Sequence, residues 1–296
     1  MPKITSEKYR FDGSRKFDIS KSQTKLKDIY TSTEEYDQLI AESAKDLDEL
    51  QSKMYAHNRY GLLVIFQAMD AAGKDGTIKH VLSGVNPAGV KIHNFKRPTD
   101  EELNHDFLWR SNKVLPERGN ITIFNRSYYE EVIVVKIDKS IIKNVQLIPE
   151  ELTSDWNKIW KHRHKDIRHM EKYLYRNGIR VIKFFLNVSK QEQADRLIER
   201  IKDPSKNWKF EEQDVKIRDQ WNEYMNAYED CINETATAHA PWYVIPADDK
   251  KNMRLIVGQV IEDELKKMNT NYPVTSAERA AELNHFIEII EQQNKT

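Results

Sequence analysis

One segment constrains the fold of this chain more than any other, because it places a glycine-bearing loop between a buried strand and a helix. The apolar run 62–66 (Leu-Leu-Val-Ile-Phe) is typical of a strand that is buried on both faces. The loop 67–76 follows with the sequence Gln-Ala-Met-Asp-Ala-Ala-Gly-Lys-Asp-Gly, and a helical pattern then runs over about 77–82. A strand, a glycine-bearing loop and a helix in this order are the context of a phosphate-binding P-loop.

The residues of this loop suit an anion. Glycines let backbone N–H groups converge, the helix N-terminus adds the positive end of its dipole, and a lysine reaches phosphate as a point charge. The predicted phosphate-binding residues of the loop are Ala71, Ala72, Gly73, Lys74, Asp75, Gly76 and Thr77. The match to the general motif is imperfect, because Ala68 replaces its first glycine and Asp75 replaces the hydroxyl residue after the lysine. An ordinary strand-to-helix turn with an exposed lysine is the alternative.

Asp70 lies inside the same loop. A carboxylate among phosphate-binding amides is electrostatically unfavourable unless it serves a cation or a proton. We therefore predict that Asp70 is a catalytic residue and a ligand of Mg²⁺. The alternative is an Asp that caps the loop through its own backbone.

A second polar motif follows the apolar run 121–124 and begins with Asn125 and Arg126. Polar groups at the carboxyl end of a parallel strand face the crevice in which ligands bind. Arg126 offers a bidentate fork to phosphate oxygens and can stabilise charge as it shifts during transfer. The alternative is an arginine that pairs with a nearby carboxylate such as Glu130.

The rest of the chain alternates strands with helices, which predicts an α/β fold with a parallel sheet covered by helices on both faces. The expected strands are 62–66, 90–93, 121–124, 181–186 and 242–245. The expected helices cover about 33–54, 77–82, 100–115, 155–176, 190–202, 211–236, 252–268 and 276–292. We expect a single domain over 1–296, with an N-terminal arm and helix in 1–58, a core in 59–268 and a C-terminal helix in 275–296.

Composition excludes several classes of protein. The 47 basic residues balance the 47 acidic ones, whereas nucleic-acid-binding proteins usually carry a basic excess, so we expect no nucleic-acid partner. No apolar run approaches the roughly 18 residues of a membrane span, and we expect no membrane partner. The one cysteine, Cys231, fits a reducing compartment, and the first residues lack the apolar core of a signal peptide. These features predict a cytoplasmic protein.

Four segments together resemble the polyphosphate kinase 2 family, and their order and spacing are more specific than any one of them. They are 70–77 (Asp-Ala-Ala-Gly-Lys-Asp-Gly-Thr), 124–129 (Phe-Asn-Arg-Ser-Tyr-Tyr), 203–210 (Asp-Pro-Ser-Lys-Asn-Trp-Lys-Phe) and 240–248 (Ala-Pro-Trp-Tyr-Val-Ile-Pro-Ala-Asp). The resemblance implies a P-loop nucleotide-kinase-like sheet with a helical lid. It also implies phosphoryl transfer between inorganic polyphosphate and adenine nucleotides, dependent on Mg²⁺, for which we expect Mn²⁺ to substitute.

The resemblance assigns roles to matching positions. It implies that Lys74 and the loop amides bind phosphate, that Asp70 organises the metal and that Arg126 contacts the transferring phosphate. It places the lid at about 200–212, with Arg200 and Lys209 among its phosphate-binding residues. Many family members carry Asp at the position of Asn125, and the Asn form resembles the subgroup that accepts both AMP and ADP. The candidate catalytic residues are Asp70, Lys74, Asn125 and Arg126.

Further basic and aromatic residues extend this hypothesis. We predict a channel for a long polyanion whose further phosphate-binding residues are Lys96, Arg97, Arg110 and Lys113. Solvated surface charge is the alternative for each of them. In the lid, Trp208 and Phe210 are candidates for packing on a nucleotide base, with core packing as the alternative. The N-terminal arm and the C-terminal helix suggest contacts between subunits, so we expect a homo-oligomer.

Two other functions compete with this one. An ATP-dependent nucleotide kinase of the same fold needs a compact acceptor site and no extended basic channel. A nucleotide-binding switch without phosphotransfer is the other alternative, although the sequence carries no Asn-Lys-x-Asp base-recognition motif.

Overall fold

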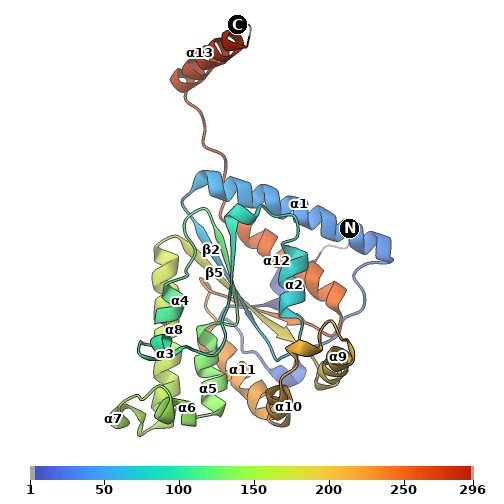
Figure 1. Ribbon diagram of the computed structural model, residues 1–296, viewed down its shortest axis with the longest axis vertical. Helices are drawn as coiled ribbons and strands as arrows, with labels where there is room; N and C mark the ends of the chain where they lie inside the picture. The colour runs from blue at the N-terminus through green and yellow to red at the C-terminus, as the bar shows by residue number, and fades with distance from the viewer. Residues whose placement is uncertain (1–3, 295–296) are drawn as a thin grey trace.

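The computed structural model describes residues 4–294 and builds them around one six-stranded sheet (Figure 1). The strands lie in the order β1-β6-β5-β2-β4-β3. Their bounds are β1 (Arg10–Phe11), β2 (Gly61–Gln67), β3 (Val90–Asn94), β4 (Ile121–Asn125), β5 (Ile179–Asn187) and β6 (Trp242–Pro246). β1 is antiparallel to β6, and the other neighbouring strands are parallel. The predicted α/β class and parallel sheet are confirmed, and each of the five expected strands is present.

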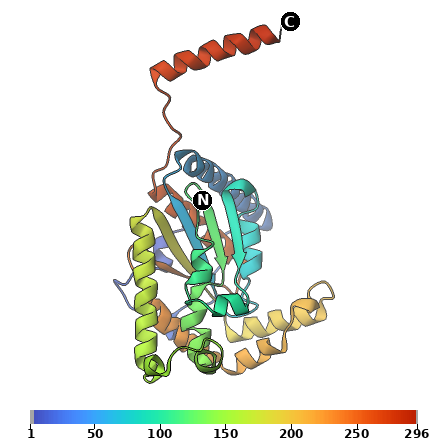
Figure 2. The same ribbon diagram turned by 60° about the vertical axis from the view of Figure 1, so that its left-hand side comes forward.

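Helices cover both faces of this sheet (Figures 1 and 2). On one face α1 (Thr33–His57), α2 (Lys74–Val81) and α12 (Lys250–Lys267) pack against one another. On the other face α8 (Trp156–Arg176) packs on β5 and on α11 (Trp221–Thr235). The shorter helices α5 (Val134–Ile137), α6 (Ser140–Asn144) and α7 (Glu150–Thr153) lie beyond the carboxyl end of β4 in the sequence. This layering leaves the carboxyl edge of the sheet open between the two helical layers.

The helix expected over 100–115 is wrong in its length. The structure has two single-turn helices, α3 (Asp100–Leu103) and α4 (Trp109–Asn112), with a break between them. The side chain of Asp106 accepts a hydrogen bond from the N–H of Leu108 at 2.9 Å. Local side-chain bonds of this kind compete with the helical backbone ladder, which accounts for the break.

The helix expected over 211–236 is also divided, because Gln220 leaves the helical conformation between α10 (Glu212–Asp219) and α11. α9 (Lys190–Lys202), the short 3₁₀ helix η5 (Asn207–Lys209) and α10 form a hairpin that projects from the body, drawn in gold at the lower right of Figure 2. This hairpin contains the segment 200–212 expected to be the lid. We call it the lid hairpin.

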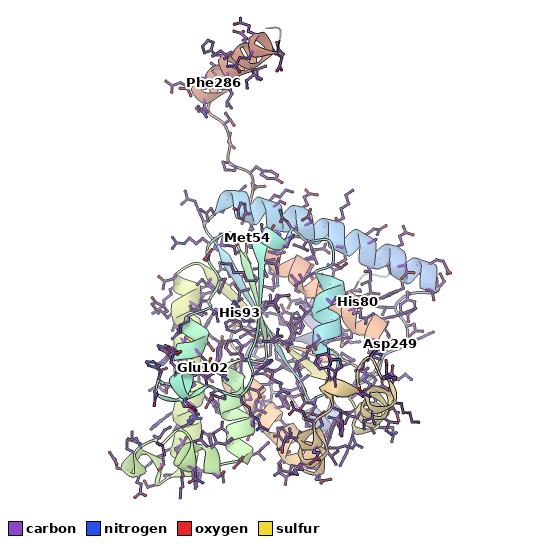
Figure 3. The ribbon with its side chains drawn as sticks, in the orientation of Figure 1. Met54, His80, His93, Glu102, Asp249 and Phe286 are labelled. Carbon is purple, nitrogen blue, oxygen red and sulfur yellow. The ribbon has the colours of Figure 1, made fainter. Side chains whose placement is uncertain are left out.

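The two ends of the chain differ in how they join the body. The N-terminal arm supplies β1, which extends the sheet beside β6 and was not expected from the sequence. α13 (Ala277–Gln293) stands away from the body and carries the exposed Phe286 (Figure 3). Residues 1–3 of the expected arm and 295–296 of the expected C-terminal helix lie outside the described residues. Within residues 4–294, no helix is long and apolar enough to cross a membrane.

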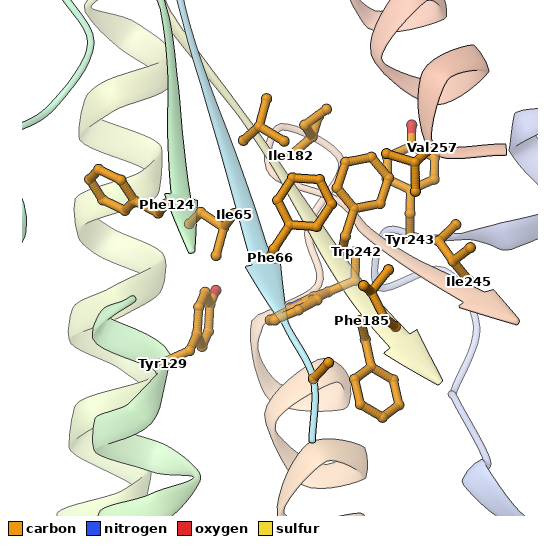
Figure 4. Close-up of a cluster of buried hydrophobic side chains, with 14 of the residues drawn as sticks. Ile65, Phe66, Phe124, Tyr129, Ile182, Phe185, Trp242, Tyr243, Ile245 and Val257 are labelled. Carbon is orange, nitrogen blue, oxygen red and sulfur yellow. The ribbon is translucent and has the colours of Figure 1, made fainter. Parts of the chain in front are cut away.

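Large apolar side chains from the central strands fill the space between the layers (Figure 4). The Phe66 ring stacks on Phe184 of the neighbouring strand at a centroid distance of 4.9 Å, and Tyr129 meets Trp242 edge to face at 4.8 Å. Every residue of β2 and of β6 is buried, as their continuous apolar runs predict. The strands that carry the candidate site residues therefore end on a rigid, closely packed base.

Candidate active site

Most of the predicted site residues converge where β2, β3 and β4 end, at the carboxyl edge of the sheet. A pocket of about 820 Å³ opens there between the loop after β2, the start of α2 and the lid hairpin. We call it the loop pocket. Among the predicted residues, its lining includes Asp70, Ala71, Gly73, Lys74, Asp75, Gly76, Lys96, Asn125, Arg126, Arg200 and Lys209. Ligands of open α/β sheets bind at this edge because the loops after parallel strands meet there.

The loop 68–73 has an irregular backbone. Ala71 and Gly73 both have left-handed conformations, with φ of 61° and 105°. Gly73 is the N-cap of α2, so the helix begins at Lys74 rather than near Thr77 as expected. Ala72 is fully buried, and its N–H donates back to the Met69 carbonyl at 3.3 Å. Alternating amides in such a turn form a concave site for an anion.

Lys74 lies beneath this loop, with 8% of its surface exposed. Its Nζ donates to the carbonyls of Ala68 at 2.9 Å and Met69 at 3.3 Å. Burial lowers the pKa of Lys74 to about 8, and the positive charge of Arg126 acts in the same direction. Because two carbonyls hold it, the buried ammonium has a fixed position at the pocket, where its charge can bind phosphate.

Asp70, Arg126 and Glu130 form one charged cluster at the centre of the site. Arg126 donates to Asp70 and, at 3.1 Å, to Glu130, so the pairing considered as an alternative for this arginine is present. Burial acts to raise the pKa of Asp70, but Arg126 and Lys74 outweigh it and the net shift is downward. Glu130 raises the pKa of Arg126, with Asp70 adding to the effect. Asp70 and Arg126 therefore keep their charges at neutral pH.

Asn125 connects the ends of two strands with the start of α2. Its Nδ2 donates to Asp75 Oδ1 and to Asn94 Oδ1, each at 2.8 Å. Asn94 ends β3, and the sequence reasoning did not single it out. The amide at position 125 is thus a hydrogen-bond donor that stabilises the Asp75 carboxylate.

A buried network anchors the segment that follows Asn125. Arg126 adopts a left-handed conformation, with φ of 62°, while its N–H donates to the Phe66 carbonyl at 3.0 Å. Tyr129 donates to Glu171 at 2.7 Å, and the fully buried Lys183 donates to the same carboxylate at 2.7 Å. Strained backbone persists only where its surroundings over-determine it, and this network supplies that support.

The lid hairpin supplies the opposite wall of the loop pocket. Lys209 approaches Asp75 at 3.7 Å, and Arg200 pairs with Asp214 at 3.3 Å. Trp208, 74% exposed, lines the pocket with its indole N–H bonded to the Ser205 carbonyl at 3.1 Å. The lid therefore brings positive charge and one exposed aromatic ring to a site that the P-loop opens from the other side.

Several predicted phosphate-binding residues lie elsewhere. Thr77 is fully buried, and its hydroxyl donates to the Gly73 carbonyl at 2.9 Å. Arg97 is exposed outside the pocket lining, and Lys113 packs on the Trp109 ring at 4.2 Å. Arg110 donates to the Lys96 carbonyl at 2.9 Å and lines a separate cavity of about 240 Å³. These four residues are thus absent from the lining of the loop pocket, although Thr77 lies one turn along α2 from Lys74.

Sequence reasoning missed two residues of α9 that contact the loop. Gln193 donates to the Asp70 carbonyl at 3.0 Å, and Arg196 donates to the Ala72 carbonyl at 2.8 Å. Both are buried. Their spacing with Arg200, three and four residues apart, places the three side chains on one face of a helix, which is the signal that would have found them.

Oxygen donors at the pocket suit a hard divalent cation. Asp70 and Asp75 both line it, and Mg²⁺ is usually held by one or two carboxylates together with substrate phosphates. Within residues 4–294, no group of three or more His, Cys, Asp or Glu side chains is arranged to hold a metal ion by itself. The residues present therefore fit Mg²⁺ bound jointly with a phosphate ligand.

Comparison with known proteins agrees with this geometry. The polyphosphate kinase 2 (PPK2) family model matches residues 30–273. An ADP-polyphosphate phosphotransferase of Rhodopseudomonas palustris is 46% identical over 281 residues, covering 95% of this chain and 96% of the relative. An AMP/ADP-polyphosphate phosphotransferase of Meiothermus ruber is 43% identical over 227 residues, covering 77% of this chain and 80% of the relative. The crystal structure of polyphosphate kinase 2 from Arthrobacter aurescens TC1 superimposes with a TM-score of 0.84 at 35% identity, covering 97% of this chain and 98% of that one. This chain belongs to the polyphosphate kinase 2 family.

Proposed function

We propose that this protein transfers phosphoryl groups between inorganic polyphosphate and adenine nucleotides, converting AMP to ADP and ADP to ATP in reversible steps. The names of its relatives support this activity, since they include phosphotransferases of polyphosphate with ADP and with both AMP and ADP. The family and the P-loop geometry support a transferase in which the loop pocket binds both reactants.

The observation that carries the proposal is the spread of positive charge along the loop pocket. Its basic lining residues are Lys74, Lys79, Lys96, Arg126, Arg200, Lys206 and Lys209, against the acidic Asp70, Asp75 and Glu211. These cations extend from the P-loop across the lid hairpin, which suits a chain of phosphates better than the single triphosphate of an ATP-dependent kinase. Binding to clustered cations of this kind weakens as salt rises.

The residues of the site divide the work of in-line transfer among them. The amides of Ala71 and Gly73 and the Lys74 ammonium hold phosphate oxygens, and Arg126 neutralises charge on the transferring group. Asp70 and Glu130 orient Arg126 through their ion pairs. The lid hairpin limits the access of water, which matters because hydrolysis competes with transfer.

Asp70, with Asp75 beside the same pocket, would hold Mg²⁺, with Mn²⁺ as its substitute. The metal when bound would neutralise phosphate charge and help to orient the reacting oxygens. The two carboxylates and the pocket position support this role.

A cytoplasmic location and a homo-oligomeric state are further parts of the proposal. The single cysteine, Cys231, is buried, which is compatible with a reducing compartment. α13 exposes Leu283, Phe286, Ile287 and Ile290, which supports an interface with another subunit.

Two parallel assays test the proposed activity. Purified protein with Mg²⁺ is offered AMP plus polyphosphate, or AMP plus ATP, and ADP and ATP are followed by chromatography, with Lys74→Ala as the inactive control. We expect ADP and then ATP to form with polyphosphate as the donor. If ADP forms only when ATP is the donor, the protein is an ATP-dependent nucleotide kinase. If neither assay gives a product, the result favours a nucleotide-binding switch without phosphotransfer.

A further inference from the structure

The face of α9 that points at the P-loop carries polar side chains whose role the proposed chemistry does not explain. Arg196 has 6% of its side chain exposed, yet its guanidinium makes contacts on three sides. It donates to the Ala72 carbonyl at 2.8 Å, to the Ala247 carbonyl at 2.6 Å and to the Glu192 carboxylate at 2.7 Å. Further bonds reach the carbonyls of Asp248 at 2.9 Å and Ala71 at 3.4 Å. With its N–H groups used in this way, and outside the lining of the loop pocket, Arg196 is placed to support the loop.

These contacts determine which way the loop amides point. In a trans peptide the C=O of one residue and the N–H of the next point in opposite directions. Gln193 holds the Asp70 carbonyl and Arg196 holds the Ala72 carbonyl, both toward α9. The N–H groups of Ala71 and Gly73 must then point away from α9, and both of these residues line the loop pocket.

The backbone at these two positions needs such support. Ala71 is left-handed at φ 61°, a conformation that residues with a Cβ adopt only rarely. A Cβ added at Gly73 would lie 3.3 Å from Met253 and 3.6 Å from the Arg196 guanidinium, so Arg196 packs directly under the loop. Within residues 4–294, the hydrogen bonds that hold the Asp70 and Ala72 carbonyls toward α9 come from Gln193 and Arg196.

The same helix leads into the lid. Arg200 of α9 lines the loop pocket and pairs with Asp214 of α10, and Arg218 of α10 donates to Gln193 Oε1 at 3.0 Å. We propose that Gln193 and Arg196 are positioning residues that hold the Ala71 and Gly73 amides in their anion-binding orientation. α9 thereby holds both the P-loop and α10 of the lid hairpin in place. The inference rests on the proposed function only in naming phosphate as the anion.

Binding of inorganic tripolyphosphate, measured by calorimetry, tests the inference without relying on turnover. Arg196→Lys replaces a planar fork with an ammonium that cannot reach the Ala72 and Ala247 carbonyls together. Gln193→Met removes the amide while keeping similar length. We expect each variant to weaken tripolyphosphate binding by about tenfold, because the loop loses a hydrogen bond that orients its amides. We also expect kcat to fall on the order of 100-fold with misplaced amides.

A matched control separates positioning from stability. Arg168 of α8 also donates to a backbone carbonyl, that of Glu234, but lies outside the loop pocket. Arg168→Lys should leave the tripolyphosphate affinity unchanged. The two α9 variants should also have non-additive effects on affinity, because they hold one loop. Folded α9 variants with wild-type affinity and kcat would overturn the inference, as would losses that disappear once the folded fraction is corrected for. Wild-type protein that binds tripolyphosphate but does not use polyphosphate as a donor would refute the proposed function alone.

Discussion

At the scale of single residues, the site depends on charges held where water cannot solvate them fully. Lys74 is buried under the loop, and Asp70 is held between Lys74 and Arg126. Burial penalises an isolated charge, so each of these groups is stabilised by an opposite charge or by carbonyls. The consequence is a set of fixed dipoles and charges that needs little rearrangement when phosphate enters.

The lowered pKa of Lys74 predicts an alkaline limit to activity. The ammonium is the form that binds phosphate, and with a pKa of about 8 it is lost as the pH rises through that value. We expect kcat/KM for polyphosphate to be level near pH 7 and to fall tenfold for each unit well above pH 8. A pH profile from 6 to 10 measures this, with Lys74→Arg as a side chain that does not titrate there. A profile that stays level to pH 10 would contradict the assignment.

Asn125→Asp should change the choice between acceptors. The substitution removes a donor from Asp75 Oδ1 and places a second carboxylate 2.8 Å from it. Like charges at this distance repel and shift the local arrangement, and we expect AMP use to fall relative to ADP use by about tenfold or more. The ratio of kcat/KM for the two acceptors measures this, with Asn94→Ala as a variant that removes one hydrogen bond without adding charge. An unchanged ratio would remove Asn125 from the specificity argument.

At the scale of elements, the lid hairpin and the buried network behind β4 contribute in different ways. The hairpin carries exposed side chains into the loop pocket, whereas the network keeps the segment after Asn125 in place. The lid hairpin is suited to contact the substrate, and the buried network keeps its charged groups away from solvent. Substitutions in the lid hairpin should therefore change substrate binding, whereas substitutions in the buried network should change the free energy of unfolding.

Trp208→Ala should weaken nucleotide binding more than polyphosphate binding. The ring is 74% exposed and lines the pocket, so it is available to stack on a base. Base–aromatic stacking contributes about 1–3 kcal/mol, so we expect KM for the nucleotide to rise about tenfold. Trp208→Phe should restore most of the loss, and Tyr173→Ala, an exposed aromatic residue on α8, should have no effect. Equal KM values for wild type and Trp208→Ala would rule out the stacking role.

Lys183→Met should destabilise the fold strongly. Both Lys183 and Glu171 are fully buried, with Nζ and the carboxylate 2.7 Å apart. Removing one partner of a buried ion pair leaves the other uncompensated, at a cost of about 3–5 kcal/mol. Urea denaturation measures this loss of stability. The double variant Lys183→Met/Glu171→Leu should lose less free energy of unfolding than the two single variants together. Strict additivity would show that the two charges do not depend on each other.

At the scale of the whole molecule, the body is built on one sheet, and α13 is added to it by an exposed linker. None of the described residues of α13 is buried, although it carries the apolar residues Leu283, Phe286, Ile287 and Ile290. An exposed apolar stripe on a helix is a surface for association. We place the expected contact between subunits here.

Deletion of residues 275–296 should separate assembly from folding. The midpoint of thermal unfolding of the subunit should change by less than about 2 °C, because surface changes of this kind alter stability little. Light scattering after size exclusion should show a smaller assembly than the full chain. An unchanged mass would place the subunit interface elsewhere, and Phe286→Ser in the full chain gives a second measurement without truncation.

The sequence by itself determined the sheet and most of the P-loop. Local signals fix these features: continuous apolar runs mark buried strands, and a strand, loop and helix in order mark the phosphate site. It also placed Asp70, Lys74, Asn125 and Arg126 at strand ends, and all four line the loop pocket. Residues close in sequence to a strand end are positioned by the strand, which is why this part could be predicted.

Only the tertiary structure decided which distant side chains complete the site. It brought Lys206 and Trp208 to the pocket from the lid, and Gln193 and Arg196 to the loop from α9, while it placed Arg110 and Lys113 outside. It also added β1 from the arm to the edge of the sheet. These outcomes depend on contacts between segments far apart in the sequence, such as the bond from Arg196 to Ala71 and the pairing of Arg10 in β1 with Tyr243 in β6. A pattern within one segment carries no information on such contacts.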